Sequence, residues 1–259
     1  MSSTLQVLAT RRGHILEVRL RRPEKRNALN LDMYESLIDA FEMAEEDDGI
    51  RVVLLSGEGA GFSAGNDLKD FLNAPPLIDA DHVILRFLHA LEGMSRILIA
   101  AIHGPTVGIG ATLLLHCDLV VAARSTKLIM PFVQLGLVPE AASTMLLPRL
   151  VGYQRAAEMF LLGEPVDAAT AKEWGLVNRV VDDEVLMERA RALADTAARQ
   201  PPGALRATKR LMRSAQSVEV RAWMQEELHV FAERLRSAEF AAATEVFFSK
   251  GSVRPVGGT

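Results

Sequence analysis

The chain has 259 residues, a formal net charge of −4 and a single cysteine. This length is typical of one large domain and is sufficient to bury a stable core without covalent cross-links. One cysteine excludes an intramolecular disulfide framework and fits a reducing compartment. The slightly acidic charge provides no electrostatic basis for nucleic-acid binding.

Targeting and membrane signals are also missing from the sequence. The N-terminus has no basic segment followed by an apolar stretch, so no signal peptide is expected. No apolar run approaches the roughly 18–20 residues that a membrane span needs. We therefore expect a soluble cytoplasmic protein that does not bind membranes.

Strand and helix patterns alternate through the first half of the chain. Two alternating strands over residues 5–9 and 14–20 predict a hairpin, and Asn30 is expected to cap a helix over 31–47. Further strands are expected over 51–56, 97–102, 117–122 and 127–130, and further helices over 81–96 and 111–116. This order predicts an α/β fold in which parallel strands are joined by right-handed crossovers.

The second half of the chain is expected to be helical, and the strands are expected to stop after about Pro139. Helical patterns cover residues 141–151, 153–162, 168–174, 183–199, 202–215, 218–235 and 238–248. We predict a core of residues 1–200 and a helical C-terminal region of residues 201–259. This region is expected to pack on the core or on a neighbouring subunit.

Two glycine-rich loops, residues 57–65 and 104–110, each follow a buried strand and lead into a helix. The first loop fits the dinucleotide-binding pattern G-x-G-x-x-A, but Pro75 and Pro76 interrupt the helix that this pattern requires. Backbone N–H groups at such helix starts can instead hold an anion or a developing oxyanion. Two ordinary strand-to-helix turns produce the same pattern, so both interpretations stay open at this point.

Glu140 is the most informative single residue, because it places a carboxylate within the apolar run of residues 135–142. Loss of hydration in such surroundings raises a carboxyl pKa toward neutrality, as a general base needs. The alternative is an exposed turn residue after Pro139, and the local sequence alone favours that alternative.

Four motifs occur in the order typical of the crotonase superfamily, the enoyl-CoA hydratases and isomerases, which the chain resembles over nearly its whole length. They are Asn27-Ala28-Leu29-Asn30, the segment from Phe62 to Leu68, the segment from His103 to Gly110, and Gly175-Leu176-Val177-Asn178. The resemblance implies a spiral of ββα units with a helical C-terminal region. It also implies an acyl-CoA thioester substrate and assembly as a homotrimer or a dimer of trimers.

The resemblance further implies which residues form the site. The oxyanion hole would be the backbone N–H groups of Asn66 and Ile109. Arg26 to Ala28 would flank the nucleotide, and Lys250 would contact phosphates of coenzyme A. The path of the thioester and coenzyme A would be lined by Ala64, Gly65, Asn66, Asp67, Leu68 and Gly108. Coenzyme A enters only as part of the substrate, and no other cofactor and no metal are expected.

Two carboxylates that hydratases use are missing, which reduces the choice of reactions. Hydratases of this superfamily resemble one another in using two glutamates, and this chain has Thr112 and Phe132 at those positions. Glu140 instead stands where Δ3,Δ2-enoyl-CoA isomerases of the peroxisomal type carry their catalytic glutamate, although Ala141 replaces the glycine that follows it there.

The predicted reaction is therefore the conversion of a 3-enoyl-CoA into the 2-trans-enoyl-CoA. Glu140 would carry a proton from C2 to C4, in an acyl pocket formed by Phe132, Leu135 and Leu137. Hydration, hydrolysis or dehalogenation of another acyl-CoA with the same carboxylate are the alternatives within the superfamily. A catalytically silent protein that binds coenzyme A is the alternative of a different class.

Overall fold

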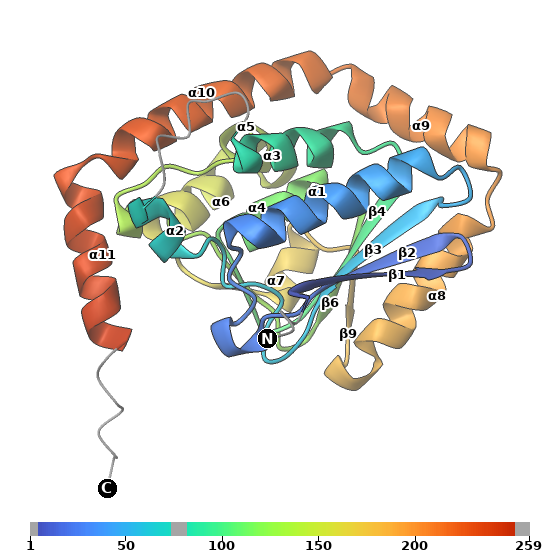
Figure 1. Cartoon of the computed structure of the whole chain (residues 1–259), viewed down its shortest axis with the longest axis horizontal. Coiled ribbons are helices and arrows are strands. Elements are labelled where there is room, and N and C mark those ends of the chain that lie inside the picture. The colour runs from blue at the N-terminus through green and yellow to red at the C-terminus, as the bar shows by residue number, and fades with distance from the viewer. Residues whose placement is uncertain (1–4, 74–81, 252–259) are drawn as a thin grey trace, which may run out of the picture.

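The computed structural model describes residues 5–73 and 82–251, and its main feature is a six-stranded sheet (Figure 1). An antiparallel hairpin forms one edge, and every other neighbouring pair in this sheet is parallel. The strands across this sheet are β1 (Val7–Arg12), β2 (Ile15–Leu20), β3 (Val52–Gly57), β4 (Ile97–Ile102), β6 (Leu119–Ala123) and β9 (Arg179–Val181). The mixed α/β class with a helical C-terminal region is thus confirmed.

A second, smaller sheet lies beside the first and consists of three short strands. Parallel strands β5 (Pro105–Val107) and β7 (Lys127–Ile129) pair first, and β8 (Val166–Asp167) adds to β7 in the antiparallel direction. The prediction that strands stop after Pro139 is wrong, because β8 and β9 both follow that residue. Both are only two or three residues long, so neither contains enough alternation to be recognised as a strand.

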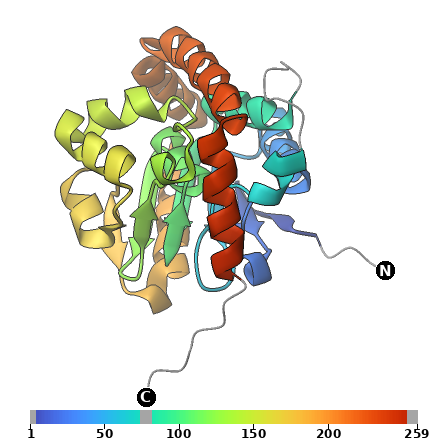
Figure 2. The ribbon, with the colours of Figure 1, turned by 90° about the vertical axis from the view of Figure 1, so that its left-hand side faces the viewer.

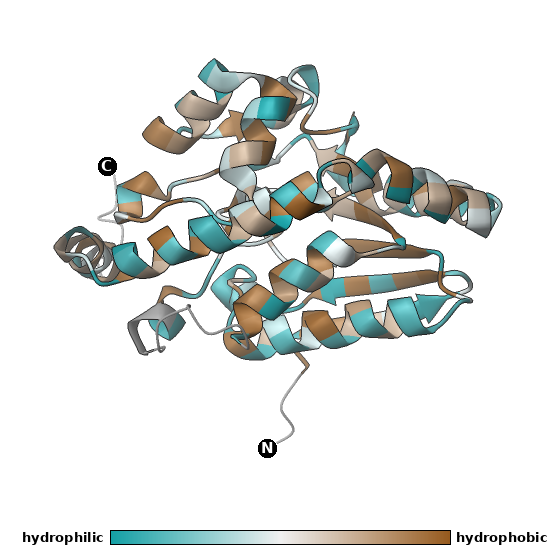
Figure 3. Cartoon of the chain, turned by 90° about the horizontal axis from the view of Figure 1, so that it is seen from above, coloured by the Kyte–Doolittle hydropathy of each residue, from teal (hydrophilic) through white to brown (hydrophobic). Residues whose placement is uncertain are grey.

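The central strands β3 and β4 are buried on both faces of the sheet, which explains why they read as continuous apolar runs. Val53 and Leu55 point into a cluster shared with helices α1 (Leu31–Glu46) and α3 (Val83–Gly93). The alternate residues of the same strands point to the opposite face, where helix α8 (Leu186–Ala198) covers them with Ala190 and Ala194. Figure 3 shows that the helices are amphipathic, because hydrophobic and hydrophilic residues alternate along each of them.

The remaining helices surround this core. These helices are α2 (Leu68–Asn73), α4 (Ile109–Thr112), α5 (Ser143–Val151), α6 (Tyr153–Ala157), α7 (Ala168–Glu173), α9 (Pro202–Ser214), α10 (Ser217–Leu235) and α11 (Ala238–Gly251), with short 3-10 or π segments between some of them. Figures 1 and 2 show the last three helices of the chain, α9, α10 and α11, as one arc around the outside of the molecule. No helix in the described ranges is both long enough and apolar enough to cross a membrane.

The division at residue 200, the trimeric or hexameric assembly and the cytoplasmic location stay predictions. Several large apolar side chains on the arc of α9 to α11 are exposed, among them Leu211, Met212 and Val218.

Asn27 ties the N-terminal strands to the first glycine loop. Its side chain is fully buried, and its Nδ2 donates to the carbonyl oxygens of Glu58 at 2.7 Å and Gly61 at 3.0 Å. Its Oδ1 accepts from the Arg22 backbone N–H at 2.8 Å. Buried polar groups of this kind are costly to leave unpaired. Asn27 therefore fixes the conformation of the first glycine loop, which leads to Gly65 and Asn66.

We predict that Asn27→Ala destabilises the protein by about 2–4 kcal/mol, because it leaves several buried backbone groups without partners. The measurement is the free energy of unfolding from urea denaturation. Gln154→Ala, at an exposed position on α6, is the control and should change stability by less than about 0.5 kcal/mol. Equal stability of the Asn27 variant and the wild type would show that the loop does not depend on these bonds.

Candidate active site

The two glycine loops come into direct backbone contact. A Cβ atom on Gly65, whose φ is +87°, would lie 2.9 Å from the carbonyl oxygen of Val107. Gly108 also has a positive φ, +53°, and a Cβ atom on it would lie 3.8 Å from the Cα of Gly65. An L side chain at either position would be strained, and at Gly65 it would also separate the loops. The glycines thus bring the residues that follow them, Asn66 and Ile109, close together.

The backbone N–H groups of Asn66 and Ile109 have no intramolecular acceptor among the described residues. Leu29 donates to the carbonyl of Gly65 and accepts from the N–H of Asp67, so the N–H of Asn66 points away from this parallel bridge. Ile109 is the first residue of α4, where helical N–H groups have no partner within the helix. Two unpaired donors therefore border one site.

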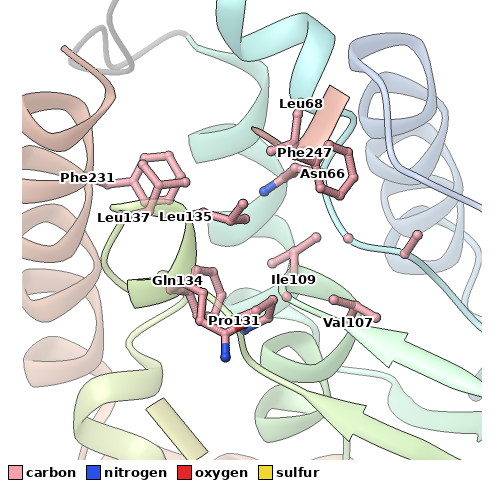
Figure 4. Close-up of a pocket in the computed structure, with 14 residues that line it drawn as sticks. Asn66, Leu68, Val107, Ile109, Pro131, Gln134, Leu135, Leu137, Phe231 and Phe247 are labelled. Atoms are coloured by element: carbon pink, nitrogen blue, oxygen red, sulfur yellow. The ribbon is translucent and has the colours of Figure 1, made fainter. Parts of the chain in front are cut away.

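These two residues border a mainly apolar cavity of about 250 Å³. Figure 4 shows its labelled side chains, with Phe231 on the side opposite Ile109 and Val107. The lining residues are Ala64, Gly65, Asn66, Leu68, Val107, Gly108, Ile109, Pro131, Phe132, Gln134, Leu135, Leu137, Phe231 and Phe247. An apolar pocket with a few converging polar donors is the usual form of a small-molecule site.

Glu140 is buried, with only 2% of its surface exposed, so the alternative of an exposed turn residue is wrong. Its Oε1 accepts a hydrogen bond from the Thr112 hydroxyl at 2.6 Å, and its Oε2 is buried without a hydrogen-bond partner among the described residues. Burial raises the pKa of the carboxyl to about 8, the Thr112 hydrogen bond opposes this rise, and the charge of Glu227 adds to it. Glu140 therefore has the protonation behaviour of a base that works near neutral pH.

Helix α4 connects Glu140 to the unpaired N–H of Ile109. Ile109 and Thr112 are three residues apart, which is about 4.5 Å along a helix axis. The first contributes its N–H at the cavity and the second holds the Glu140 carboxyl. Glu140 itself is not one of the residues that line the cavity, so its carboxyl lies behind this wall.

The Glu140 turn is held in an unusual backbone conformation. Ala141 and Ala142 have φ values of +65° and +52°, a region that costs non-glycine residues about 1 kcal/mol or more each. The His116 imidazole makes a 2.8 Å hydrogen bond from Nε2 to the carbonyl of Ala141. Burial lowers the pKa of His116 to about 4, so the ring is neutral and donates this bond through Nε2–H. Packing thus maintains a strained turn directly after the carboxyl, as is common at functional sites.

Most residues predicted from the resemblance do meet at the cavity. Ala64, Gly65, Asn66, Leu68, Gly108, Ile109, Phe132, Leu135 and Leu137 all line it. Arg26, Ala28 and Asp67 do not. Asp67 forms an ion pair with Arg22 at 2.8 Å, and although burial raises its pKa, the Arg22 and Lys69 interactions bring the pKa below the ordinary value. The side chain of Lys250 lies outside the described residues.

The sequence patterns missed several residues of the site. Phe231 on α10 and Phe247 on α11 line the cavity from helices more than 90 residues beyond Pro131 and Gln134. In the sequence they are ordinary apolar positions of helical patterns, which carry no sign of where the helix docks. The sequence gives one indication of the contact with Glu140, which is Thr112 within an apolar segment. A buried hydroxyl needs a polar partner, and here that partner is the Glu140 carboxyl.

A metal site is not formed within residues 5–73 and 82–251. No three His, Cys, Asp or Glu side chains in these ranges come together in a way that could hold a metal ion. The polar groups described at the cavity are the backbone N–H groups of Asn66 and Ile109 and the side chains of Asn66 and Gln134, and the Glu140 carboxyl lies behind the wall.

Comparison with protein families identifies the chain. Residues 10–254 match the model of the enoyl-CoA hydratase/isomerase family. The chain belongs to this family. The match covers all four motifs and confirms the predicted membership of the crotonase superfamily. It also supports an acyl-CoA thioester as the substrate.

Individual relatives have different reactions. The chain is 37% identical to 1,2-epoxyphenylacetyl-CoA isomerase from Escherichia coli, covering 92% of this chain and 93% of that protein. It is 32% identical to human enoyl-CoA delta isomerase 2, covering 95% of this chain and 64% of that protein. A crystal structure of an enoyl-CoA hydratase/isomerase from Pseudoalteromonas atlantica superposes with a TM-score of 0.91 at 40% identity, covering 95% and 98% of the two chains. Other relatives are named as hydratases, so similarity alone does not select the reaction.

The raised pKa of Glu140 has a consequence for stability. The folded protein keeps this proton up to about pH 8, whereas the unfolded chain loses it near pH 4.5. Between these values the folded state binds more protons, so this carboxyl lowers stability as the pH rises, by up to about 1.4 kcal/mol per pH unit. We predict that Glu140→Gln removes this part of the pH dependence, and that the variant gains stability over the wild type from pH 5 to pH 8.

Urea denaturation at several pH values measures this difference. Glu226→Gln, an exposed neighbour of Glu227 on α10, is the matched control and should show a constant difference from the wild type. A constant difference for the Glu140 variant as well would mean that its carboxyl is not protonated in the folded protein at neutral pH.

Proposed function

We propose that this protein is an enoyl-CoA isomerase that converts a 3-enoyl-CoA into the conjugated 2-trans-enoyl-CoA. The observation that carries the proposal is one buried carboxyl, Glu140, held behind a cavity that two unpaired backbone N–H groups border. A second carboxyl that could activate water is missing from the usual positions, which Thr112 and Phe132 occupy. Isomerisation needs only one base, because no water is added.

The reaction begins with removal of a proton from C2 of the acyl chain. This proton is acidic because both the thioester carbonyl and the double bond stabilise the resulting dienolate. The N–H groups of Asn66 and Ile109 would donate to the dienolate oxygen. Each donor in such a hole is worth roughly 3–4 kcal/mol of transition-state stabilisation. Because both belong to the backbone, they are already oriented before the substrate arrives.

Glu140 would take the C2 proton and return it to C4. Oε1 is occupied by the Thr112 hydroxyl, so Oε2, which has no partner in the described part of the chain, is the oxygen available for the proton. A carboxyl with a pKa near 8 is basic enough to accept this proton and acidic enough to release it again. The apolar walls formed by Phe132, Leu135 and Leu137 would exclude water from the dienolate.

A second candidate is the isomerisation of an epoxyphenylacetyl-CoA, whose acyl group carries a six-membered carbon ring with an epoxide. It is favoured by the name of the Escherichia coli relative and by three phenylalanines, Phe132, Phe231 and Phe247, around the cavity. A panel of acyl-CoA substrates separates the two candidates. The same panel detects hydration, hydrolysis or dehalogenation, and the absence of any turnover with intact binding of coenzyme A would favour a silent binding protein.

We predict that purified protein converts a trans-3-enoyl-CoA into the conjugated thioester, followed by its ultraviolet absorbance. Glu140→Gln should lower kcat by about 10²–10⁴-fold, the usual contribution of a general base. Binding of coenzyme A, measured by calorimetry, should be unchanged, and Glu226→Gln should have wild-type activity. If the Glu140 variant isomerises as fast as the wild type, Glu140 is not the base. If the wild type hydrates 2-enoyl-CoA and leaves 3-enoyl-CoA untouched, the protein is a hydratase.

The pH profile tests the role of Thr112. We predict that kcat/KM for the wild type rises with pH and levels off above about pH 8, because only the ionised carboxylate accepts the C2 proton. Thr112→Val removes the hydrogen bond that favours the ionised form, so the rising part of the profile should move to higher pH.

Thr112→Ser is the matched control for this profile, since it keeps the hydroxyl and should follow the wild type. Coincident pH profiles of the Thr112→Val and Thr112→Ser variants would show that the hydroxyl does not act on the base.

A further inference from the structure

A second buried glutamate, Glu227, lies on α10 close to the Glu140 turn. Only 6% of its surface is exposed. Its Oε1 accepts from the backbone N–H of Thr144 at 2.8 Å and from the Thr144 hydroxyl at 2.5 Å. The same hydroxyl accepts from Nε1 of Trp223, one turn earlier on α10, at 2.8 Å. Specific hydrogen bonds therefore hold the Thr144 hydroxyl between two side chains of α10, Glu227 and Trp223.

These bonds place Glu227 at the start of α5, where a capping group is otherwise missing. The residue at the N-cap position, Ala142, has no side chain that can accept a hydrogen bond, and no side-chain cap is formed there. The carboxylate of Glu227 supplies the missing acceptor from another helix, and negative charge is favourable at this end of a helix. The turn of Ala141 and Ala142 is thus held by His116 on one side and by Glu227 on the other.

Helix α10 also contributes to the cavity wall. Phe231 follows Glu227 by four residues, so the two side chains lie on the same face of the helix. Phe231 lines the acyl cavity, whereas Glu227 reaches the turn after Glu140. One rigid helix therefore connects the acyl pocket to the segment that carries the base.

We propose that Glu227 is a positioning residue for the Glu140 base, which it serves by capping α5 and holding the strained turn of Ala141 and Ala142. This inference rests on the proposed function, in which Glu140 carries the proton. The carboxylate of Glu227 is engaged with the backbone N–H and hydroxyl of Thr144, so the proposal gives it no part in the proton transfer itself. Removing it leaves the N–H of Thr144 unpaired and releases the turn, and a displacement of about 1 Å in a catalytic group can cost on the order of a hundredfold in rate.

Glu227 also acts on Glu140 through its charge. Among the described residues, Tyr34 and His116 are titratable groups near the turn, and both are neutral near pH 7, because burial raises the pKa of Tyr34 well above 10 and lowers that of His116 to about 4. The cations Arg213 and Lys209 lie on the far side of His116, where their charges also lower its pKa. Burial raises the pKa of Glu227 to about 7, against the opposing hydrogen bonds from Thr144. Above that pH its negative charge adds to the rise in the pKa of Glu140 that burial causes.

Two substitutions separate the hydrogen bond from the charge. Glu227→Gln keeps an acceptor for Thr144 but removes the charge, so kcat at high pH should stay near the wild-type value while the rising part of the kcat/KM profile moves to lower pH. Glu227→Ala removes both, and kcat should fall by on the order of a hundredfold. KM should change little, since Glu227 does not line the cavity. Glu226→Gln and Glu226→Ala, on the exposed face of α10, are the matched controls.

Thermal unfolding of each variant is recorded alongside the kinetics. If Glu227→Ala does not fold, Thr144→Val tests the same contact, because it keeps the backbone N–H and loses the hydroxyl. In that variant kcat should fall, but by less than the roughly hundredfold loss expected for Glu227→Ala. Wild-type kcat and an unshifted pH profile in folded Glu227 variants, with Glu140→Gln inactive, would overturn the positioning role alone. Full activity of Glu140→Gln would instead overturn the proposed function, so the two failures are distinguishable.

Discussion

The burial of one carboxyl, Glu140, is the constraint on which the rest of the site depends. An ionised carboxylate without water is unfavourable, so burial raises the pKa of this group to about 8. Within the described part of the chain, the one side-chain hydrogen bond that it accepts comes from Thr112. The same burial leaves Oε2, the oxygen proposed to take the proton, without a hydrogen-bond partner among the described residues. A fully solvated carboxylate at this position would be too weak a base for a carbon acid. The apolar core around Glu140 therefore sets its chemistry as well as its place.

The backbone provides the other half of the site. Gly65 and Gly108 let two strand-to-helix loops touch, and the N–H groups that follow them are left unpaired in the described part of the chain. Such donors need no side chain and lose no rotamer freedom when a substrate binds. The turn after Glu140 contains two left-handed alanines, Ala141 and Ala142, and it leads to Thr144, whose N–H donates to Glu227. Members of one family can therefore keep these backbone donors and change the reaction by moving the carboxylates.

Much of this could be predicted from the sequence, and the reasons for the rest are physical. The strand Ile97–Ile102 and the helix capped by Asn30 were predicted because long apolar runs and capping residues act locally. Strands β8 and β9 were missed because two or three residues carry no period. Glu227 reads in the sequence as one more charge on a mixed helix. Its burial arises from a contact with Thr144, 83 residues away, which only the tertiary fold creates.

Isotope transfer tests the central claim, a single buried base that shuttles one proton, most directly. A 3-enoyl-CoA deuterated at C2 would be turned over once in ordinary water, and the product examined by mass spectrometry and NMR for deuterium at C4. Because Glu140 is 2% exposed, we expect part of the label to pass from C2 to C4 on the same carboxyl before it exchanges with solvent. A product with only solvent hydrogen at C4 would contradict the account of a carboxyl that is shielded from solvent while it carries the proton.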